Sequence, residues 1–316
     1  MRTRIAAIDI GTVTARLLVA DVTEHGLVEL AKRAEIVNLG EGVDATGVLS
    51  EAAMERTCAA VASYMDVVRG FEEPGAPVTV VALATSASRD AKNAQVFQDK
   101  LARLGVTLTV IPGEREAALS FLGASADFPG ERLLVTDVGG GSTELICGIG
   151  GQEPLFKHSF NIGCRRVTER NLAGDPPTAQ EIAAARAWCH PQFAAFFDEV
   201  RSLGFEIDRM VSVAGTATTV VSIRDRMEVY DSSRVQGAQV TAADLARVTT
   251  QVASVPLAER VHITGLQAGR APVIVAGMLI LQDLVDLAGT GSFTASENDI
   301  LQGIIMSTAQ RMDGRA

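Results

Sequence analysis

Residues 133–150 read LLVTDVGGGSTELICGIG, and this stretch decides the fold. Three consecutive glycines separate two apolar runs, with Asp137 before the glycines and Glu144 after them. Apolar runs of this length that end at glycine predict buried strands joined by a tight turn. We expect the glycines to supply the positive φ of such a turn and to let a ligand approach the backbone N–H groups.

A second copy of this unit stands near the N-terminus, where residues 5–22 read IAAIDIGTVTARLLVADV. Aligned without a gap, the two stretches match in their apolar runs and at four further positions: Asp9 with Asp137, Gly11 with Gly139, Thr14 with Ser142, and Leu17 with Leu145. An ordinary tight turn would explain one GGGS sequence, but it does not explain a twin in register. The chain therefore contains one strand–turn–strand unit twice.

Length and composition limit the class of protein. The chain has 316 residues, 47% of them hydrophobic and 21% charged, which predicts about two folded domains rather than disorder. The net charge of -10 argues against nucleic-acid or membrane-surface binding. The apolar run at 271–287 carries Gln282, Asp283 and Asp286 and is too short to span a bilayer.

The cysteines predict a cytoplasmic protein. No two of the four form a C-x-x-C pair, and the four histidines do not cluster with them, so we expect reduced thiols and no zinc site. The N-terminal apolar run is interrupted by Asp9, so it is not a signal peptide.

The first part of the chain predicts the order βββαβαβα. Three strands at 5–9, 15–22 and 27–37 precede a helix at 50–69 that Ser50 caps. A buried strand at 78–84, one amphipathic helix over 88–104, a strand at 107–111 and a helix at 114–126 follow.

The pattern restarts after residue 126 with strands at 132–137, 143–149 and 154–162, and a mainly helical region with strands at 209–214 and 291–295 follows. We therefore expect an N-terminal domain over 1–119 and a C-terminal domain over 120–316 that face each other across a cleft. The last helix, about 298–311, is placed to pack back on the first domain.

The glycine turn has the chemistry of a phosphate site. Successive N–H groups form an anion nest, and the hydroxyls of Ser142 and Thr143 add donors. Asp137 and Glu144 are hard oxygen ligands that suit Mg²⁺. The sequence has neither G-x-x-x-x-G-K-[ST] nor a G-x-G-x-x-G leading into a helix, which excludes a P-loop and a dinucleotide fingerprint. A strand-to-helix junction at Gly215-Thr216 is either a second anion site or a plain turn.

Two D-x-G hairpins resemble those of the actin, sugar-kinase and heat-shock-chaperone superfamily. Within it, the chain is similar to the exopolyphosphatase and guanosine pentaphosphate phosphohydrolase family. The segments that carry the resemblance are AAIDIGTVTARLLV, ATSASRDAKN, VIPGEREA, VTDVGGGSTEL, FNIGCRRVTER, VAGTATT and GLQAGRAPVIVAG. They cover nearly the whole chain in the family's order. The resemblance implies an α/β fold of two duplicated ribonuclease-H-like (actin-like ATPase) domains, each a mixed β-sheet with flanking helices, with the active site in the interdomain cleft.

The resemblance also implies a Mg²⁺-dependent hydrolase, with Mn²⁺ as the alternative metal, that removes the terminal phosphate of inorganic polyphosphate or of guanosine pentaphosphate (pppGpp). Glu116 matches the proposed general base, with Glu114 as a rival, and Asp137 and Glu144 match the acidic pair. The expected metal ligands are Asp137, Glu144 and Asp9. The expected phosphate-binding residues are Asp9, Gly11, Thr12, Thr14, Arg89, Gly139, Gly140, Gly141, Ser142, Thr143, Gly215 and Thr216. Members are often dimeric, which implies a homodimer.

Three positions depart from the family pattern. Val13 stands where Asn is usual, Arg115 where a second acid is common, and Gln302 where a charged residue is common. A basic track for a polyanion is expected from Arg89, Lys92, Arg115, Arg165, Arg166 and Arg170.

Four functions remain open at this point: a short-chain exopolyphosphatase, which we favour, a pppGpp phosphohydrolase linked to the stringent response, an ATP-dependent kinase on the same fold, and a non-catalytic module that binds an alarmone or polyphosphate.

Overall fold

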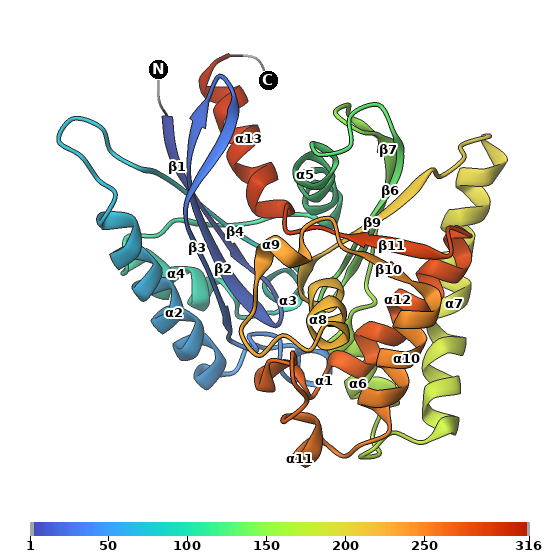
Figure 1. Cartoon of the computed structure of the whole chain (residues 1–316). Coiled ribbons are helices and arrows are strands. Elements are labelled where there is room, and N and C mark those ends of the chain that lie inside the picture. The colour runs from blue at the N-terminus through green and yellow to red at the C-terminus, as the bar shows by residue number, and fades with distance from the viewer. Residues whose placement is uncertain (1–2, 315–316) are drawn as a thin grey trace. The chain divides into compact units, whose positions relative to one another are not determined.

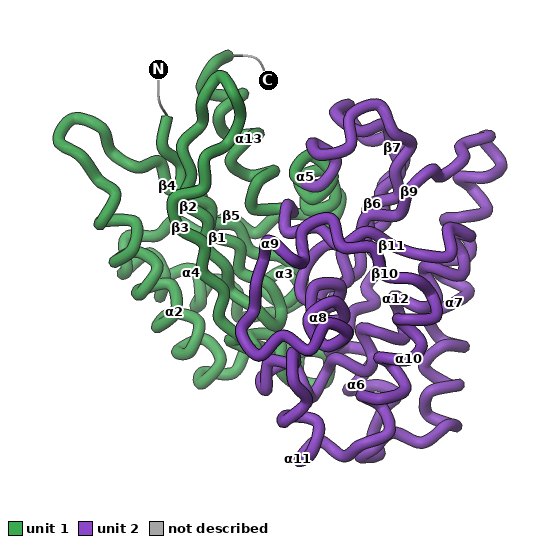
Figure 2. Tube along the Cα trace, viewed as in Figure 1, with its two compact units in different colours: residues 1–123, 300–316 green, residues 124–299 purple. Residues whose placement is uncertain are grey.

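The computed structural model describes residues 3–314, which form two compact units (Figure 1). Unit 1 comprises residues 1–123 and 300–316, and unit 2 comprises residues 124–299. Figure 2 draws unit 1 in green and unit 2 in purple. The chain therefore passes from one unit to the other twice, and its last helix belongs to the unit that contains the N-terminal strands.

Unit 1 is built on a mixed five-stranded sheet. Its strands are β1 (Thr3–Ile10), β2 (Thr14–Thr23), β3 (Gly26–Ile36), β4 (Thr79–Ala84) and β5 (Leu108–Val110). The strand order is β3-β2-β1-β4-β5. The first three strands pair antiparallel, and β4 and β5 continue the sheet in parallel from β1. All five strands fall where the sequence predicts them.

Helices cover both faces of this sheet. They are α1 (Val43–Thr46), α2 (Glu51–Arg69), α3 (Ser86–Asp90), α4 (Ala94–Ala102), α5 (Gly113–Ser125) and α13 (Ile300–Met312). Because strand side chains alternate, Ile8 of β1 packs in the core that contains α2 and α4, while Ile5 and Ala7 pack in the core that contains α13. Ser50 caps α2 as expected and accepts a hydrogen bond from Ala53 N at 3.2 Å.

The single helix predicted over 88–104 is wrong, because the structure divides this segment into α3 and α4. Ala91 is extended between them. The Asn93 side chain accepts from Leu49 N at 2.8 Å and donates to Leu49 O at 2.9 Å. Lys92 N also donates to Gly47 O at 2.9 Å. These long-range bonds hold residues 91–93 out of a helix, and amphipathic periodicity does not reveal them.

Unit 2 repeats the same sheet. Its strands are β6 (Arg132–Val138), β7 (Thr143–Ile149), β8 (Pro154–Phe160), β9 (Arg209–Val213), β10 (Gln239–Thr241) and β11 (Ser292–Ala295), in the order β10-β11-β9-β6-β7-β8. Read from β8, the first five strands have the order and directions of unit 1. The duplicated α/β fold class is confirmed. The three-residue edge strand β10 was not predicted.

The helices of unit 2 are α6 (Cys164–Asn171), α7 (Ala179–Ser202), α8 (Ala214–Arg224), α9 (Ser232–Val235), α10 (Ala242–Ala253), α11 (Leu257–Arg260), the short η1 (Ala268–Arg270) and α12 (Ile274–Ala288). The apolar run at 271–287 supplies α12, most of whose residues are buried. Within residues 3–314, no helix combines the length and the apolar character needed to cross a membrane.

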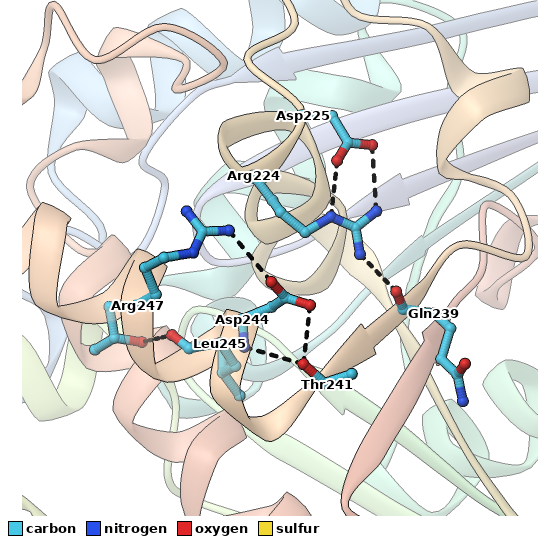
Figure 3. A network of polar contacts seen from close by, with 8 residues as sticks. Arg224, Asp225, Gln239, Thr241, Asp244, Leu245 and Arg247 are labelled. Carbon is cyan, nitrogen blue, oxygen red and sulfur yellow. Dashed lines mark hydrogen bonds and ion pairs between the residues drawn. The ribbon is translucent and has the colours of Figure 1, made fainter.

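A polar network fixes the end of α8 (Figure 3). Arg224 donates from Nε to Asp225 at 2.7 Å and from Nη1 to the carbonyl of Gln239 in β10 at 2.5 Å. The hydrogen bond from Arg224 lowers the pKa of the Asp225 carboxyl. Nearby, Thr241 caps α10 by accepting from Asp244 N at 3.1 Å. Since α8 begins directly after β9, this network also restrains the helix whose first turn holds Gly215 and Thr216.

Candidate functional site

The predicted site residues fall into two groups, one in each unit, and each group is described by itself. The unit 1 group is Asp9, Gly11, Thr12, Thr14, Arg89 and Glu116. The unit 2 group is Asp137, Gly139, Gly140, Gly141, Ser142, Thr143, Glu144, Gly215 and Thr216.

The two hairpin turns have the same closing geometry. Gly11 N donates to Thr14 O at 3.0 Å in unit 1, and Gly139 N donates to Ser142 O at 3.0 Å in unit 2. The expectation that these glycines supply positive φ is wrong, since neither Gly11 nor Gly139 has it. A Cβ on either would instead lie 3.2 or 3.1 Å from the carbonyl oxygen that closes the turn. Glycine thus relieves a tight contact where two backbone segments approach each other.

In unit 2, the backbone of the glycine turn presents three donors in succession. The carbonyls of Gly139 and Gly140 accept from the N–H groups of Cys164 and Arg165, at 2.8 and 2.9 Å, at the start of α6. The Gly141 carbonyl accepts from Arg166 Nε at 3.0 Å. In a trans peptide, the C=O and the following N–H point in opposite directions.

The next three N–H groups, those of Gly140, Gly141 and Ser142, therefore point away from α6. Within residues 3–314, none of these three groups has a hydrogen-bond acceptor, and the Ser142 hydroxyl has no partner either. Because buried backbone donors are nearly always satisfied, and Ser142 is only 3% exposed, this run of donors is suited to an anionic ligand.

Two buried carboxylates stand beside this turn. Asp137 and Glu144 are directly opposite each other in the antiparallel pairing of β6 with β7, so their side chains share one face of the sheet. Asp137 is 6% exposed and Glu144 is fully buried. Ser159 Oγ donates to Glu144 Oε1 at 2.6 Å. Neighbouring buried carboxylates repel each other unless a cation or a proton lies between them, so the donor set fits a hard divalent cation.

The corresponding register position in unit 1 carries opposite charges. Asp9 is paired across β1 and β2 with Arg16, which is the twin of Glu144. Arg16 donates to Asp9 Oδ2 from Nη2 at 2.7 Å and from Nε at 3.1 Å. The duplicated hairpins thus hold an acid–base pair in unit 1 and an acid–acid pair in unit 2. The difference is visible in the gapless alignment of the two hairpins, where Arg16 falls on Glu144.

The second cluster of unit 1 brings together Glu116 and Arg89. Glu116 lies in the first turn of α5 and is 8% exposed, whereas its rival Glu114 is exposed. Arg89 Nη1 lies 3.6 Å from Glu116 Oε2 and donates to Ile111 O at 3.2 Å. The guanidinium keeps the neighbouring carboxylate ionised, and its planar donors suit the oxygens of a phosphate group.

The last helix fixes the position of α5. Gly303 of α13 lies so close to α5 that a Cβ would be 1.9 Å from Leu119 O. Arg115 Nη2 donates to Ser307 Oγ of α13 at 2.8 Å. Arg115, which departs from the family pattern, therefore has a hydrogen-bond partner in unit 1.

The other two residues that depart from the family pattern also form hydrogen bonds, Val13 through its backbone carbonyl and Gln302 through its side chain. Val13 is buried, and its carbonyl accepts from the N–H groups of Val37 and Asn38, each at 2.9 Å. Gln302 donates to Glu29 Oε1 at 2.9 Å.

Two predicted phosphate-binding threonines use their hydroxyl hydrogens internally. Thr143 Oγ1 donates to Ile162 O at 2.6 Å, and Thr216 Oγ1 donates to Val138 O at 3.0 Å. These two hydroxyl hydrogens are therefore already engaged within unit 2.

The junction that holds Gly215 contains a residue that the sequence analysis missed. A Cβ on Gly215 would lie 2.0 Å from Nη1 of Arg270, so the guanidinium rests against the first turn of α8. Ala214, just before it, has φ of 62°. Arg270 belongs to the segment GLQAGRAPVIVAG, which carried the family resemblance but received no role.

Most residues of the expected basic track have intramolecular partners. Besides Arg115, Arg165 pairs with Glu169 at 3.3 Å, and Arg166 donates to Gly141. Arg170 stacks over the Trp188 ring at 4.8 Å. Lys92 is exposed.

Comparison with protein-family models gives a match to the Ppx/GppA phosphatase family over residues 18–312. Among curated proteins, the chain is similar to Exopolyphosphatase 2 of Mycobacterium tuberculosis (strain ATCC 25618 / H37Rv), with 36% identity over 97% of this chain and 99% of the relative. It is 29% identical to the guanosine-5'-triphosphate,3'-diphosphate pyrophosphatase of Vibrio atlanticus (strain LGP32), over 95% of this chain and 58% of that protein.

Among solved structures, the chain is similar to an exopolyphosphatase-like protein. The TM-score is 0.90 at 32% sequence identity, over 98% of this chain and 99% of that one. At this identity and coverage, the likeness extends to the family as well as the fold.

Proposed function

Because the chain belongs to the Ppx/GppA phosphatase family, we propose that it is an exopolyphosphatase that hydrolyses the terminal phosphate of inorganic polyphosphate. One observation carries the proposal: the N–H groups of Gly140, Gly141 and Ser142 have no acceptor among residues 3–314 and adjoin the Asp137–Glu144 pair. Donors and carboxylates in this combination suit a phosphate group that arrives with a divalent cation.

In this proposal Asp137 and Glu144 hold Mg²⁺, with Mn²⁺ as the alternative. Within the described residues, no three His, Cys, Asp or Glu side chains are grouped to hold a metal, so two carboxylates would be supplemented by water and substrate oxygens, as Mg²⁺ prefers. A bound cation would neutralise negative charge on the phosphates. Asp9 is left out of the revised metal set, because Arg16 already neutralises it.

Glu116 is the proposed general base. It would orient the attacking water and accept its proton, while Arg89, 3.6 Å away, contacts the phosphate oxygens. The N–H groups of the glycine turn would stabilise charge that develops on the transferred group, since they are held in place by α6 before substrate binds.

Short polyphosphates are the proposed preferred substrates. Five of the six residues expected to form a basic track have intramolecular partners: Arg89, Arg115, Arg165, Arg166 and Arg170. A net charge of -10 adds repulsion for chain segments that extend beyond the bound phosphates.

The second candidate is pppGpp hydrolysis. The observation in its favour is the 29% identity to the Vibrio atlanticus pyrophosphatase, which is named for that nucleotide. Both candidate reactions hydrolyse a phosphoanhydride bond, so the site residues of unit 1 and unit 2 suit either substrate.

Phosphate release from polyphosphate, pppGpp and ATP, each with Mg²⁺ or EDTA, tests the proposal. We expect Mg²⁺-dependent release that is fastest from polyphosphate. Preference for pppGpp supports the second candidate, phosphate transfer from ATP to an acceptor supports a kinase, and binding without turnover supports a non-catalytic module.

We further propose a cytoplasmic homodimer that binds neither nucleic acid nor membranes. The net charge of -10 and the four free cysteines are consistent with this proposal. Light scattering of the purified chain, and gel shift with DNA and RNA, test its parts separately.

A further inference from the structure

The glycine turn of unit 2 is held by the segment that follows β8. Gly163 ends this segment in extended backbone, with φ of -144° and ψ of 167°. The first N–H groups of α6 follow at once and donate to the carbonyls of the turn. A Cβ on Gly163 would lie 2.4 Å from Gly140 O and 2.6 Å from Gly141 N. Only glycine allows the segment to approach the turn this closely.

In unit 1, the segment after β3 likewise holds the Gly11–Thr14 turn by hydrogen bonds to its carbonyls. We call such a segment the support of its turn. The segment after β3 donates from Gly40 N to Thr12 O at 2.9 Å and from Val37 N and Asn38 N to Val13 O at 2.9 Å. In both units, the carbonyls of the second and third turn residues therefore accept hydrogen bonds from residues that follow the third strand. A Cβ on Gly40 would lie 2.3 Å from Thr12 Cγ2 and 3.1 Å from Ala87 Cβ.

The support also repeats in the sequence. Residues 38–40 read Asn-Leu-Gly after β3, and residues 161–163 read Asn-Ile-Gly after β8. The spacing from hairpin to support differs by five residues between the units, so the gapless alignment of the hairpins does not show this match. The internal duplication thus includes a third strand and a supporting glycine as well as the hairpin.

We propose that Gly163 and Gly40 are positioning residues that keep the N–H groups of the two turns directed at the substrate phosphates. This inference rests on the proposed function. Each glycine lets backbone donors reach the turn carbonyls, and each bonded carbonyl turns the following N–H to the opposite side. Neither residue touches the phosphate itself. Their effect on the reaction is transmitted through Gly140 and Gly141 in unit 2 and through Thr12 in unit 1.

The decisive variant is Gly163→Ala with Gly150→Ala as a matched control. Gly150 lies in unit 2, just beyond the opposite end of β7, and a Cβ there would be 1.8 Å from Phe128 O. Neither glycine has positive φ, so both variants suffer a backbone clash without a change in backbone preference. We expect both to lower Tm, while only Gly163→Ala raises KM for tripolyphosphate, by about tenfold or more, as when hydrogen bonds to a charged group are lost.

A rescue experiment tests the support in unit 1. The severe clash predicted for Gly40→Ala is with the Thr12 methyl group at 2.3 Å, which Thr12→Ser removes while keeping the hydroxyl. The remaining contact, with Ala87 Cβ at 3.1 Å, needs only a small shift of that side chain. We expect Gly40→Ala to raise KM less than Gly163→Ala, because a side-chain tip yields more easily than a backbone carbonyl. The double variant should recover the KM of Thr12→Ser alone. Failure of this rescue would overturn the role of Gly40.

Pyrophosphate binding measured by calorimetry gives a readout that does not depend on turnover. Weaker binding in Gly163→Ala than in Gly150→Ala, at comparable Tm, supports the positioning role even if the wild-type enzyme hydrolyses a different phosphoanhydride. Equal binding and equal KM in the two variants would overturn it, because Gly163 would then contribute to stability alone. Absence of hydrolysis in the wild type would count against the proposed function and leave the binding comparison decisive.

Discussion

Asp137 lies directly opposite Glu144 across β6 and β7, with both carboxylates buried on one face of the sheet. The equivalent pair in the first hairpin is Asp9 and Arg16, which form an ion pair at 2.7 Å. At this register position the two copies of the hairpin therefore differ, with a pair of opposite charges in unit 1 and two acids in unit 2. We infer that the unit 2 hairpin holds the cation and that the unit 1 hairpin does not.

Asp137→Asn should raise the Mg²⁺ requirement, because an amide is a weaker and uncharged ligand for a hard cation. We expect the Mg²⁺ titration midpoint to move to higher concentration, with activity partly restored at high Mg²⁺. Asp9→Asn is the matched control, since Asp9 occupies the twin position but is paired with Arg16. Loss of activity in Asp137→Asn at an unchanged midpoint would show that Asp137 does not act through the cation.

Gel analysis of a long polyphosphate should show a smooth ladder of shortening intermediates. The reason is that Arg115, Arg165, Arg166 and Arg170 are engaged within the protein, which leaves little basic surface to retain a long chain. Repulsion by the acidic surface is screened beyond about 8 Å at physiological salt, so the preference for short chains should weaken as salt rises. Disappearance of full-length substrate without intermediates would mean processive binding along a track formed by other residues.

The network around Arg224 predicts a pH-dependent contribution to stability. The pKa of Asp225 is lowered in the folded protein, mainly by its hydrogen bond from Arg224. A lowered folded-state pKa means that the stabilisation is present above the unfolded value, about 3.9, and is lost as pH falls through the folded value. Asp225→Asn should therefore lower Tm at pH 7 and have little effect near pH 2. A Tm difference that stays constant from pH 7 to pH 2 would contradict the ion-pair explanation.

The sequence predicted the sheets well because their signal is local. Both hairpins and the parallel strands at 79–84 and 209–213 follow from apolar runs and their duplication. The break between α3 and α4 did not follow, because it depends on hydrogen bonds between Asn93 and Leu49, which are 44 residues apart. Helix periodicity carries no information on such contacts.

Only part of the candidate site could be predicted, because motifs carry local information and do not show tertiary contacts. The family resemblance favoured Glu116 over Glu114, and the structure places Glu116 in a buried position beside Arg89. Motifs could not reveal that Thr216 donates its hydroxyl hydrogen to Val138, or that Arg270 rests against Gly215, since both facts depend on tertiary packing. The resemblance also implied a metal role for Asp9, which stays a prediction, and the sequence did not show that Arg16 forms an ion pair with Asp9.

The most direct test of Glu116 as the general base is the turnover of Glu116→Gln, measured beside that of Glu114→Gln. Glutamine preserves the shape of Glu116 and its contact with Arg89 but does not accept the proton of the attacking water. We predict that kcat for tripolyphosphate falls on the order of 10²–10⁴-fold in Glu116→Gln, with KM and Tm nearly unchanged and Glu114→Gln close to wild type. A kcat of Glu116→Gln within about threefold of wild type, or a large loss in Glu114→Gln instead, would contradict the assignment of the general base.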